Sequence, residues 1–518
     1  MKIKAVERGM NSLLFSSLLA LVALGSCLGG EPAGAKPNII FILTDDQGYG
    51  DLSAHGNPVL KTPNFDRIHH ESLRFTNWFN SPTCAPTRSA LLTGRHEFRN
   101  GITHTILERE RLDPKATTLP QVLKGAGYHT GIFGKWHLGD EDAYQPGRRG
   151  FDEVFIHGGG GIGQTYPGSC GDAPGNRYFD PAILHNDTFE KTQGYCTDVF
   201  FNQAVKWMDG QRKQGPFFCW LATNAPHGPY IAKPEDAALY EGKGLGKDTE
   251  QFFGMIHNID ANLGRLLETL KQWDIEKNTL LVLMNDNGGT AGVKVFNAGM
   301  HGAKGSPWLG GTRAFSFWRW PGTLQPAECK ALTAHIDAFK TFASIAGASL
   351  PEALLDQSAE GRDLMPLLKN PEAEWQDRHL FTHVGRWPKG TDPNNAKLNN
   401  CAVRNERYTL VREGGRNPKA KKVASSWQLF DVINDPGQTT NIADQQPGVV
   451  TKLSAVYDEW WASLKGQVSL NEDALGPKLN PFAEKYWRQF GGGPTEEDFK
   501  RMDPNRAKTF EAGRKAPK

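Results

Sequence analysis

Four short apolar runs in the first 300 residues each end in a group of polar or charged residues. The runs NIIFILTDD, HTGIFGKWHLG, PFFCWLATNAPHGPY and NTLLVLMNDNGG begin at Asn38, His129, Pro216 and Asn278. Uninterrupted apolar runs of this length, bounded by Gly, Pro and Asn, predict strands that are buried on both faces of a mainly parallel sheet. Because ligands bind beyond the carboxyl ends of the strands in open α/β sheets, we expect the four polar ends to converge.

Amphipathic stretches separate these runs. TTLPQVLKGAG predicts one helix, and MIHNIDANLGRLLETLKQW predicts another, because its apolar residues recur at helical spacing. These residues are Ile256, Ile259, Leu263, Leu266, Leu267 and Leu270. The alternation of strands and helices indicates an α/β fold with a large mixed, mainly parallel sheet sandwiched by helices.

The pattern changes after about residue 370. CAVRNERYTLVREGG and SSWQLFDVINDPGQTTNIAD are typical of antiparallel strands with a tight turn at NDPG, and PGVVTKLSAVYDEWWASL is typical of a packing helix. We therefore predict a large domain over residues 37–370 and a smaller subdomain, an antiparallel sheet plus one helix, over residues 371–518. The last fifty or so residues are rich in Pro, Gly and Lys, and we expect them to wrap the surface or to be mobile.

Residues 1–35 have the composition of a secretory signal peptide, with a basic start, an apolar segment and the cleavage site AGA. LGSC, at residues 24–27, resembles a bacterial lipoprotein box in which Cys27 would carry a lipid. No later stretch is long and apolar enough to span a bilayer. We expect an exported protein that is periplasmic, at the cell surface or secreted, either free or lipid-anchored.

The charge balance argues against a nucleic-acid partner. The 518 residues include 59 Lys and Arg against 57 Asp and Glu, so no overall field attracts a polyanion. The short KAKK run at residues 419–422 is typical of a solvated loop. Among the 7 cysteines, Cys170 and Cys196 are a plausible disulfide pair around a glycine-rich loop in an exported protein, although sequence alone does not give connectivity.

One cysteine stands apart from the others. In TCAPTRSALLTGR, Cys84 lies at the start of a predicted helix, since Pro86 suits the first helical turn and Gly94 suits the helix end. Helix N-termini favour negative charge, so Cys84 is expected to be either a low-pKa thiolate or a group made from a cysteine. Arg88 lies about one turn further along and can reach the same anion.

CAPTRSALLTGR resembles the signature of the type I sulfatases, a family of the alkaline phosphatase superfamily. Further family motifs are matched in family order over residues 37–325 by DDQGYGD, GKWHLG, APHGPY, NDNGG and HGAKGSPWLGGTR. LFDVINDPGQTTNIAD resembles the family's C-terminal strand pair. The resemblance implies that a formylglycine-generating enzyme converts Cys84 to 3-oxoalanine (formylglycine), whose hydrate is the nucleophile.

Two pairs of oxygen-bearing residues indicate a metal site. Asp45 and Asp46 follow one predicted buried strand, and Asp286 and Asn287 follow another. Such donors suit Ca²⁺, or Mg²⁺ less readily, rather than zinc. A single pair of aspartates would usually cap a turn, but two pairs on different strands favour a metal. The resemblance implies that the converted Cys84 also contacts the ion.

Lys135 and His137 lie two residues apart on an extended segment and therefore face the same side. The resemblance implies that Lys135 binds the sulfate and the aldehyde hydrate, and that His137 is the base that regenerates the aldehyde. By the same resemblance, Arg88 holds the nucleophile's hydroxyl. His227, with Lys304 beside it, would be a sulfate ligand and the general acid for the leaving alcohol.

Two more histidines, His157 and His301, are candidates for lining the substrate pocket. Many relatives have Tyr-Glu-Gly-Gly where this chain has Trp308 and Leu309 before two glycines, so a substrate contact of that tyrosine or glutamate does not transfer. The specificity loops are expected at IHGGGGIGQTYPGSCGDAPGNRYFD and near Trp387.

The resemblance implies hydrolysis of the sulfate monoester of a small molecule or, given export, of a sulfated glycan. The hydrated aldehyde would attack sulfur and later expel sulfate by collapsing to the aldehyde. Two alternatives remain open, a formylglycine-dependent phosphodiester or phosphonate monoester hydrolase and a non-catalytic protein that binds sulfated glycans. The oxygen-only metal donors argue against a two-zinc phosphatase, which needs more histidine ligands.

Overall fold

The computed structural model describes residues 36–166, 168–350, 360–414, 426–472 and 479–495. The predicted signal peptide with its lipoprotein cysteine, and the KAKK run, lie outside the described residues. Within these ranges, no helix combines the length and the apolar character that crossing a bilayer requires.

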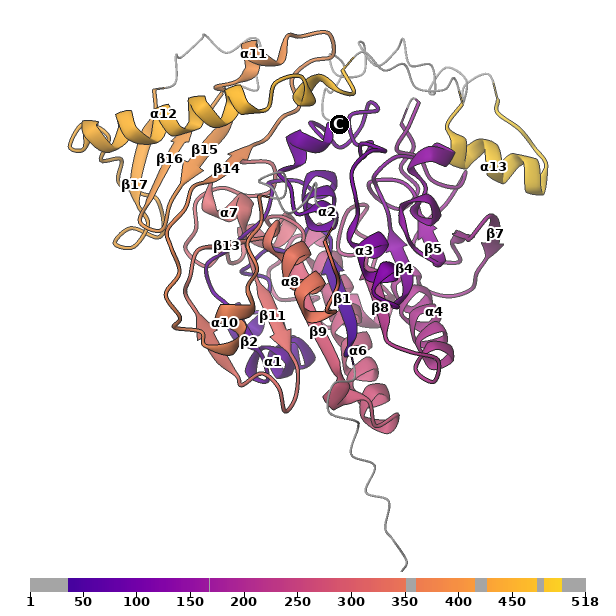
Figure 1. The fold of residues 1–518 in the computed structure, drawn as a ribbon. Helices are drawn as coiled ribbons and strands as arrows, with labels where there is room; N and C mark the ends of the chain where they lie inside the picture. The colour runs from indigo at the N-terminus through magenta and orange to yellow at the C-terminus, as the bar shows by residue number, and fades with distance from the viewer. Residues whose placement is uncertain (1–35, 167, 351–359, 415–425, 473–478, 496–518) are drawn as a thin grey trace, which may run out of the picture. The chain divides into compact units, whose positions relative to one another are not determined.

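A ten-stranded sheet forms the centre of the fold, in the order β12-β2-β11-β9-β1-β8-β4-β5-β6-β7 (Figure 1). Its five parallel central strands are β9 (Thr279–Asn285), β1 (Asn38–Thr44), β8 (Phe217–Ala222), β4 (His129–Lys135) and β5 (Glu153–His157). The outer strands are β12 (Ala327–Cys329), β2 (Leu73–Phe75), β11 (Ser316–Arg319), β6 (Ala182–His185) and β7 (Thr188–Lys191). Four of the central strands are the four apolar runs, so the prediction of a mixed, mainly parallel sheet is confirmed.

The two faces of this sheet bury separate apolar clusters, because successive side chains of a strand point to opposite faces. In β1, Phe41 belongs to one cluster and Ile42 to the other. The first cluster includes side chains of α2 (Cys84–Thr93), α3 (Leu119–Gly125) and α8 (Asp337–Ile345). The second includes side chains of α1 (Pro63–His70), α4 (Cys196–Gln211) and α6 (Lys247–Gln272). The predicted sandwich of helices around the sheet is confirmed.

Short elements connect these layers. A three-stranded sheet joins β10 (Arg313–Ala314), β3 (Trp78–Phe79) and β13 (Thr333–Ala334). The short α-helices are α5 (Pro234–Ala238), α7 (Leu309–Thr312), α10 (Met365–Lys369) and α11 (Pro393–Ala396). The 3₁₀ helices are η1 (Ser53–His55), η2 (Glu97–Asn100), η3 (Asp142–Tyr144), η4 (Pro146–Arg149), η5 (Glu276–Asn278), η6 (Ala291–Lys294) and η7 (Gln467–Ser469).

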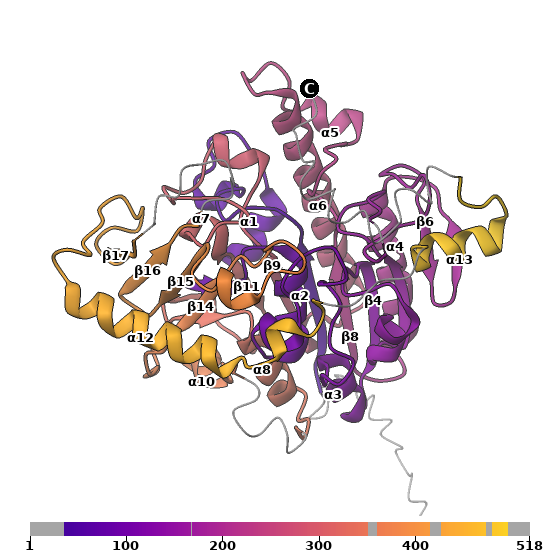
Figure 2. The ribbon, with the colours of Figure 1, turned by 90° about the horizontal axis from the view of Figure 1, so that it is seen from above.

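A four-stranded antiparallel sheet follows, formed by β14 (Leu380–His383), β15 (Cys401–Arg404), β16 (Tyr408–Arg412) and β17 (Gln428–Asp431). Helix α12 (Pro447–Ser463) lies across it (Figures 1 and 2). The predicted antiparallel sheet and its packing helix are therefore observed, whereas the division of the chain at residue 370 stays a prediction.

Two details of this region differ from the prediction. The NDPG segment does not lead into another strand in the described residues, because Asp435 accepts the backbone N–H groups of Thr439 and Thr440 and so closes a turn. The tail contains an ordered helix, α13 (Pro481–Phe490), which contacts β7 (Figure 1).

The suggested disulfide is wrong, because Cys170 and Cys196 are both buried free cysteines. Cys170 packs in a small cluster with Ile106 and Leu107. Cys196 begins α4, belongs to the apolar cluster under the central sheet, and has its Sγ 3.6 Å from Oδ1 of Asn224. The two thiols therefore belong to different packing clusters.

Candidate active site

The polar residues that follow the central strands converge at the carboxyl edge of the sheet. Asp45 follows β1, Asp286 follows β9, and Lys135 is the last residue of β4. The backbone N–H of Asp286 donates to the carbonyl of Thr44 at 2.9 Å and so joins two strand ends. His227 lies in the loop after β8. The convergence expected from the sequence pattern is observed.

Helix α2 brings Cys84 to this edge. The helix begins at Cys84 and ends before Gly94, which has φ +66°, as predicted. The Cys84 side chain is buried, and Arg88 lies one turn further on. One arginine N–H group, from Nη2, donates to Oδ2 of Asp286 at 3.0 Å, and Nη1 donates to the carbonyl of Lys135 at 3.1 Å. Arg88 therefore fixes α2 to the ends of two strands.

Cys84 lies close to three carboxylates and one histidine. Ligand atoms of Asp45, Cys84 and Asp286 lie within 4.8 Å of one another, and the same holds for Asp46, Cys84 and His227. The backbone N–H of Asp46 also donates to Oδ1 of Asp286 at 3.2 Å. Residues that are up to about 240 positions apart in the chain thus surround one side chain.

The donors at this edge fit a hard divalent cation. Oδ1 of Asp45 and Oδ1 of Asn287 are buried, and neither has a hydrogen-bond partner in the described part of the chain. The amide Nδ2 of Asn287 donates to Oδ1 of Asp46 at 3.0 Å and so orients the asparagine. Carboxylate and amide oxygens are the ligands that Ca²⁺ and Mg²⁺ prefer, and an ion would satisfy both unpartnered oxygens.

Two lysines face these carboxylates. Nζ of Lys135 donates to Oδ2 of Asp45, and both side chains are completely buried. Nζ of Lys304 donates to Oδ1 of Asp46 and lies 3.7 Å from Sγ of Cys84. The lysines supply positive charge in a site from which water is largely excluded, where its effect on an anion is strong.

The surroundings of Cys84 act on the pKa of its thiol in opposite directions. Burial raises that pKa above its ordinary value, and the charges of Lys135 and Lys304 oppose the rise without reversing it. A low-pKa thiolate thus has no support from these surroundings, and a group made from the cysteine stays a prediction.

His137 is held by a contact that the sequence did not reveal. Its backbone is left-handed, with φ +63°, and its Nε2 lies 2.7 Å from the carbonyl of Thr105. Since a carbonyl only accepts, Nε2 carries the proton and Nδ1 is left as an acceptor. Burial lowers the pKa of His137, which keeps the ring neutral. No motif in the loop around Thr105 signals this contact.

His227 is positioned by a tyrosine that the sequence also did not reveal. The hydroxyl of Tyr178 donates to the carbonyl of His227 at 2.6 Å, and Nε2 of His227 lies 3.7 Å from Oδ2 of Asp46. Burial lowers the pKa of His227 to about 3. Burial also raises the pKa of Asp46, but the charges of Lys304 and His227 outweigh it and hold that pKa below its ordinary value.

The two histidines predicted to line the pocket differ in position. His157 is fully buried at the end of β5 and pairs in register with Lys135, so it lies beside the convergent residues. His301 is exposed, and its ring packs 4.2 Å from that of Trp308. Trp308 is itself buried against Phe430 of the four-stranded sheet, so it serves packing.

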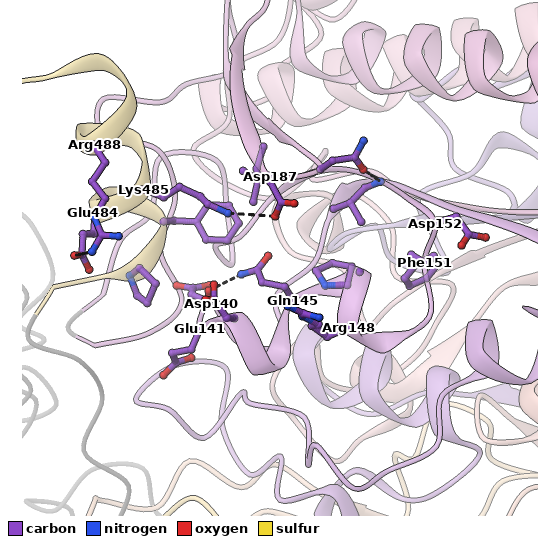
Figure 3. Close-up of a pocket in the computed structure, with 18 residues that line it drawn as sticks. Asp140, Glu141, Gln145, Arg148, Phe151, Asp152, Asp187, Glu484, Lys485 and Arg488 are labelled. Carbon is purple, nitrogen blue, oxygen red and sulfur yellow. Dashed lines mark hydrogen bonds and ion pairs between the residues drawn. The ribbon is translucent and has the colours of Figure 1, made fainter.

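A cavity of about 810 Å³ beside β5 and α13 contains none of the predicted site residues (Figure 3). Its charges pair locally. Lys485 lies 3.6 Å from Asp187, Arg488 contacts Glu484, and Gln145 donates to the carbonyl of Asp140. Six Asp or Glu side chains line the cavity against three Lys or Arg side chains, so its lining is acidic and does not suit an anionic ligand.

The comparisons with known proteins agree with this geometry. A family model described as Sulfatase matches residues 37–348, and one described as N-sulphoglucosamine sulphohydrolase, C-terminal, matches residues 312–459. The chain is 31% identical to the N-acetylgalactosamine-6-sulfatase of Mus musculus over 88% of this chain and 91% of that protein. It is 32% identical to human arylsulfatase A over 68% and 70%. The solved structure of Ps i-CgsB in complex with k-i-k-neocarrahexaose has a TM-score of 0.71 and 27% identity, covering 90% of this chain and 100% of that one.

Proposed function

Because the chain belongs to the sulfatase family, whose members are sulfuric ester hydrolases, we propose that it is an exported enzyme that removes sulfate from a sulfated carbohydrate. The substrate class is inferred from an N-acetylgalactosamine-6-sulfatase and a carrahexaose complex among its relatives. Export is inferred from the composition of residues 1–35.

One observation supports this proposal most directly: Cys84 lies at the start of a buried helix, close to three carboxylates and to Lys304. Sulfatases generally use formylglycine and a divalent metal. At position 84 a formylglycine would supply the nucleophilic oxygen, and Ca²⁺ would supply charge to the sulfate oxygens. Asp45, Asp46, Asp286 and Asn287 would hold the ion, together with residue 84.

The chain's own cations hold the sulfate. Arg88, Lys135 and Lys304 surround residue 84 and provide fixed positive charge where negative charge develops. Fixed donors of this kind usually contribute more to catalysis than any other single effect, and one donor is worth about 3–4 kcal/mol. Each of these cations already has an acidic partner, so none has to reorient during the reaction.

Two histidines carry out the proton transfers, one as a base and the other as an acid. Nδ1 of His137 is an unprotonated acceptor in the described structure, which suits a base that takes a proton from the group at position 84. His227 gives a proton to the leaving alcohol. The negative charge of a bound sulfate raises the pKa of His227 and so favours the protonated ring that this step needs.

Mass spectrometry of the peptide that contains Cys84 tests the proposal directly. The expected result is conversion of the thiol to the aldehyde, together with release of sulfate from N-acetylgalactosamine 6-sulfate or a sulfated oligosaccharide. A fully active enzyme with an unmodified thiol would refute the mechanism. Faster hydrolysis of an aryl phosphodiester than of an aryl sulfate would refute the substrate class.

Removal of the metal provides a second test. A calcium chelator is expected to abolish turnover, and added Ca²⁺ is expected to restore it better than Mg²⁺. The Asp286→Asn variant should need a higher Ca²⁺ concentration for half-maximal activity, because it removes one negative charge from the donors. Unchanged activity after complete removal of bound metal would contradict the site.

A further inference from the structure

A second cavity, with a volume of about 620 Å³, lies where the three-stranded sheet and α8 meet the four-stranded sheet and α12. We call it the junction cavity. Its walls include Phe79 from β3, Lys340 from α8, Leu380 from β14 and Trp460 from α12. None of the residues assigned above to sulfate hydrolysis lines it, so it is separate from the candidate active site.

Three buried N–H groups on this wall have no acceptor in the described residues. They belong to Nε1 of Trp460, Nε2 of His96 and Nε of Arg378. Nδ1 of His96 accepts the backbone N–H of Phe98 at 3.2 Å, so the proton of this neutral ring is on Nε2. Leaving a buried donor unpaired costs about 1–3 kcal/mol, and native proteins rarely do so. The unpartnered buried side-chain atoms on the wall are all donors, which calls for an acceptor.

The wall is also positively charged. Five Lys or Arg side chains line it, against two Glu side chains. Some of this charge is compensated, since Arg99 pairs with Glu360 at 2.7 Å and Arg378 pairs with Asp337 behind the wall. Lys340, Glu459 and two arginines, Arg362 and Arg404, make up the rest of the charged lining.

Neither remaining arginine forms an ion pair within the described ranges. Arg362 is only partly buried and donates to the carbonyls of Gln376 and Asp377. Arg404 donates to Oγ1 of Thr409 at 3.0 Å and lies 3.7 Å from the ring centre of Phe79. Burial lowers the pKa of Arg404 to about 9, since no carboxylate offsets the loss of water. A buried charge without an opposite partner is costly, and an anion would remove that cost.

Aromatic rings complete the wall. Trp460 stacks on Phe381 with ring centres 4.7 Å apart, and both residues line the cavity. The cavity therefore offers charged donors and apolar ring faces together, which matches a ligand that has an anionic group on a partly apolar ring.

We propose that the junction cavity binds an oxyanion, a sulfate or carboxylate group that is either free in solution or carried by a saccharide. Arg362 and Arg404 provide the charge, because guanidinium groups bind oxyanions through paired N–H donors. His96 and Trp460 provide further donors. This site goes beyond the proposed hydrolysis and does not depend on Cys84.

Calorimetric titration of the whole protein with inorganic sulfate tests the site, with ionic strength held constant by chloride. The double variant His96→Asn/Arg404→Met removes two of the groups, and asparagine can still accept the Phe98 N–H. We expect the junction site's Kd for sulfate to rise at least tenfold, while turnover of an aryl sulfate stays within twofold. Arg407→Ala, which changes an exposed arginine outside the cavity, should alter neither measurement. An isotherm equal to the wild-type one would overturn the proposal.

A second double variant, Arg362→Ala/Trp460→Phe, repeats the test if the first fails to fold. A free anion and a saccharide-borne anion are distinguished by binding measurements in the Cys84→Ala background. The probes are inorganic sulfate, N-acetylgalactosamine 6-sulfate and N-acetylgalactosamine. Weaker binding of both sulfated probes in the cavity variants indicates recognition of the anion alone. A change restricted to the sugar sulfate indicates a saccharide-borne anion. If each probe binds with the same Kd with and without the cavity substitutions, the junction site is overturned. This outcome does not depend on whether the enzyme hydrolyses sulfate esters.

Discussion

The candidate active site, which we call the catalytic edge, and the junction cavity both contain cations, but the partners of these cations differ. At the catalytic edge, Arg88 faces Asp286, Lys135 faces Asp45, and Lys304 faces Asp46. In the junction cavity, Arg362 and Arg404 face mainly backbone carbonyls, a hydroxyl and a ring in the described structure.

This difference shows that lysine and arginine side chains suit different functions, depending on whether a carboxylate pairs with them. Cations that are locked to carboxylates stay in place through a reaction and so favour catalysis. Cations that line a cavity without a carboxylate partner gain most when an anion arrives, and so favour binding. The following variants test this contrast between the two regions.

Replacing Cys84 by Ala should have the largest effect, and only at the catalytic edge. The change removes the group from which the nucleophile is made, and kcat should fall by about 10⁴-fold or more. Sulfate binding in the junction cavity should be unchanged in the same variant. Cys170→Ala, which removes another buried free thiol, should retain activity. Similar losses in both variants, measured with an aryl sulfate, would contradict a special role for Cys84.

Arg378→Leu tests a junction arginine that, like the cations of the catalytic edge, is paired with a buried carboxylate. Its guanidinium contacts both oxygens of Asp337, which is fully buried. Loss of one partner from a buried pair should lower the free energy of unfolding by about 3–5 kcal/mol. The matched change Arg407→Ala breaks an exposed pair with Asp431 and should cost less than about 1 kcal/mol. Urea denaturation measures both, and equal costs would contradict the assignment of the Arg378 pair as buried and structural.

Lys304→Met tests whether a paired cation acts on the reaction. Nζ of Lys304 lies 3.7 Å from Sγ of Cys84, so its loss should lower kcat by about 10²–10³-fold. Lys340→Met changes a lysine of the junction cavity and should leave kcat within twofold. Steady-state kinetics with an aryl sulfate measure kcat for both variants. A larger loss of kcat in Lys340→Met than in Lys304→Met would contradict the assignment of Lys304 to the active site.

The sequence predicted the convergence of polar residues at this edge of the sheet, because the information for it is local. Each central strand is one apolar run, and the residues beyond it, such as Asp45 and Asp286, follow directly in the chain. Parallel strands then bring these ends to the same edge of the sheet without further information. The motifs around Cys84 and Lys304 added their expected roles through the family resemblance.

The junction cavity was not predicted because its contacts are long-range. Arg378 meets Asp337 and Trp460 meets Phe381 across separations that no short motif encodes. The same reason explains why the Thr105 carbonyl behind His137 was missed, since a backbone acceptor leaves no mark in the sequence. The Cys170–Cys196 error arose because spacing in the chain does not show into which cluster each thiol packs.

Two buried glutamates show the same contrast between paired and unpaired charges, and it predicts a smaller effect, on the pH dependence of stability. Burial, and then the charge of Glu108, raise the pKa of Glu110 to about 7 from 4.5. Burial also raises the pKa of Glu97, but His96 and His335 outweigh it and hold that pKa at about 2. Glu110 thus resembles the unpaired groups of the junction cavity, and Glu97 resembles the paired groups of the catalytic edge.

The sign of the pH effect differs between these two residues. The folded state favours protonated Glu110, so its contribution to stability is complete below about pH 4.5 and is lost as the pH rises through about 7, by roughly 3 kcal/mol. Glu110→Gln keeps a neutral side chain and should therefore raise the free energy of unfolding at pH 8.5 but not at pH 4.5. Glu97→Gln should lower it at pH 8.5, because the charged form of Glu97 is the stabilised one. Urea denaturation at the two pH values measures the free energy of unfolding of both variants. If Glu97→Gln stabilised the protein, or if the effect of Glu110→Gln did not depend on pH, the proposed difference between the paired and the unpaired glutamate would be contradicted.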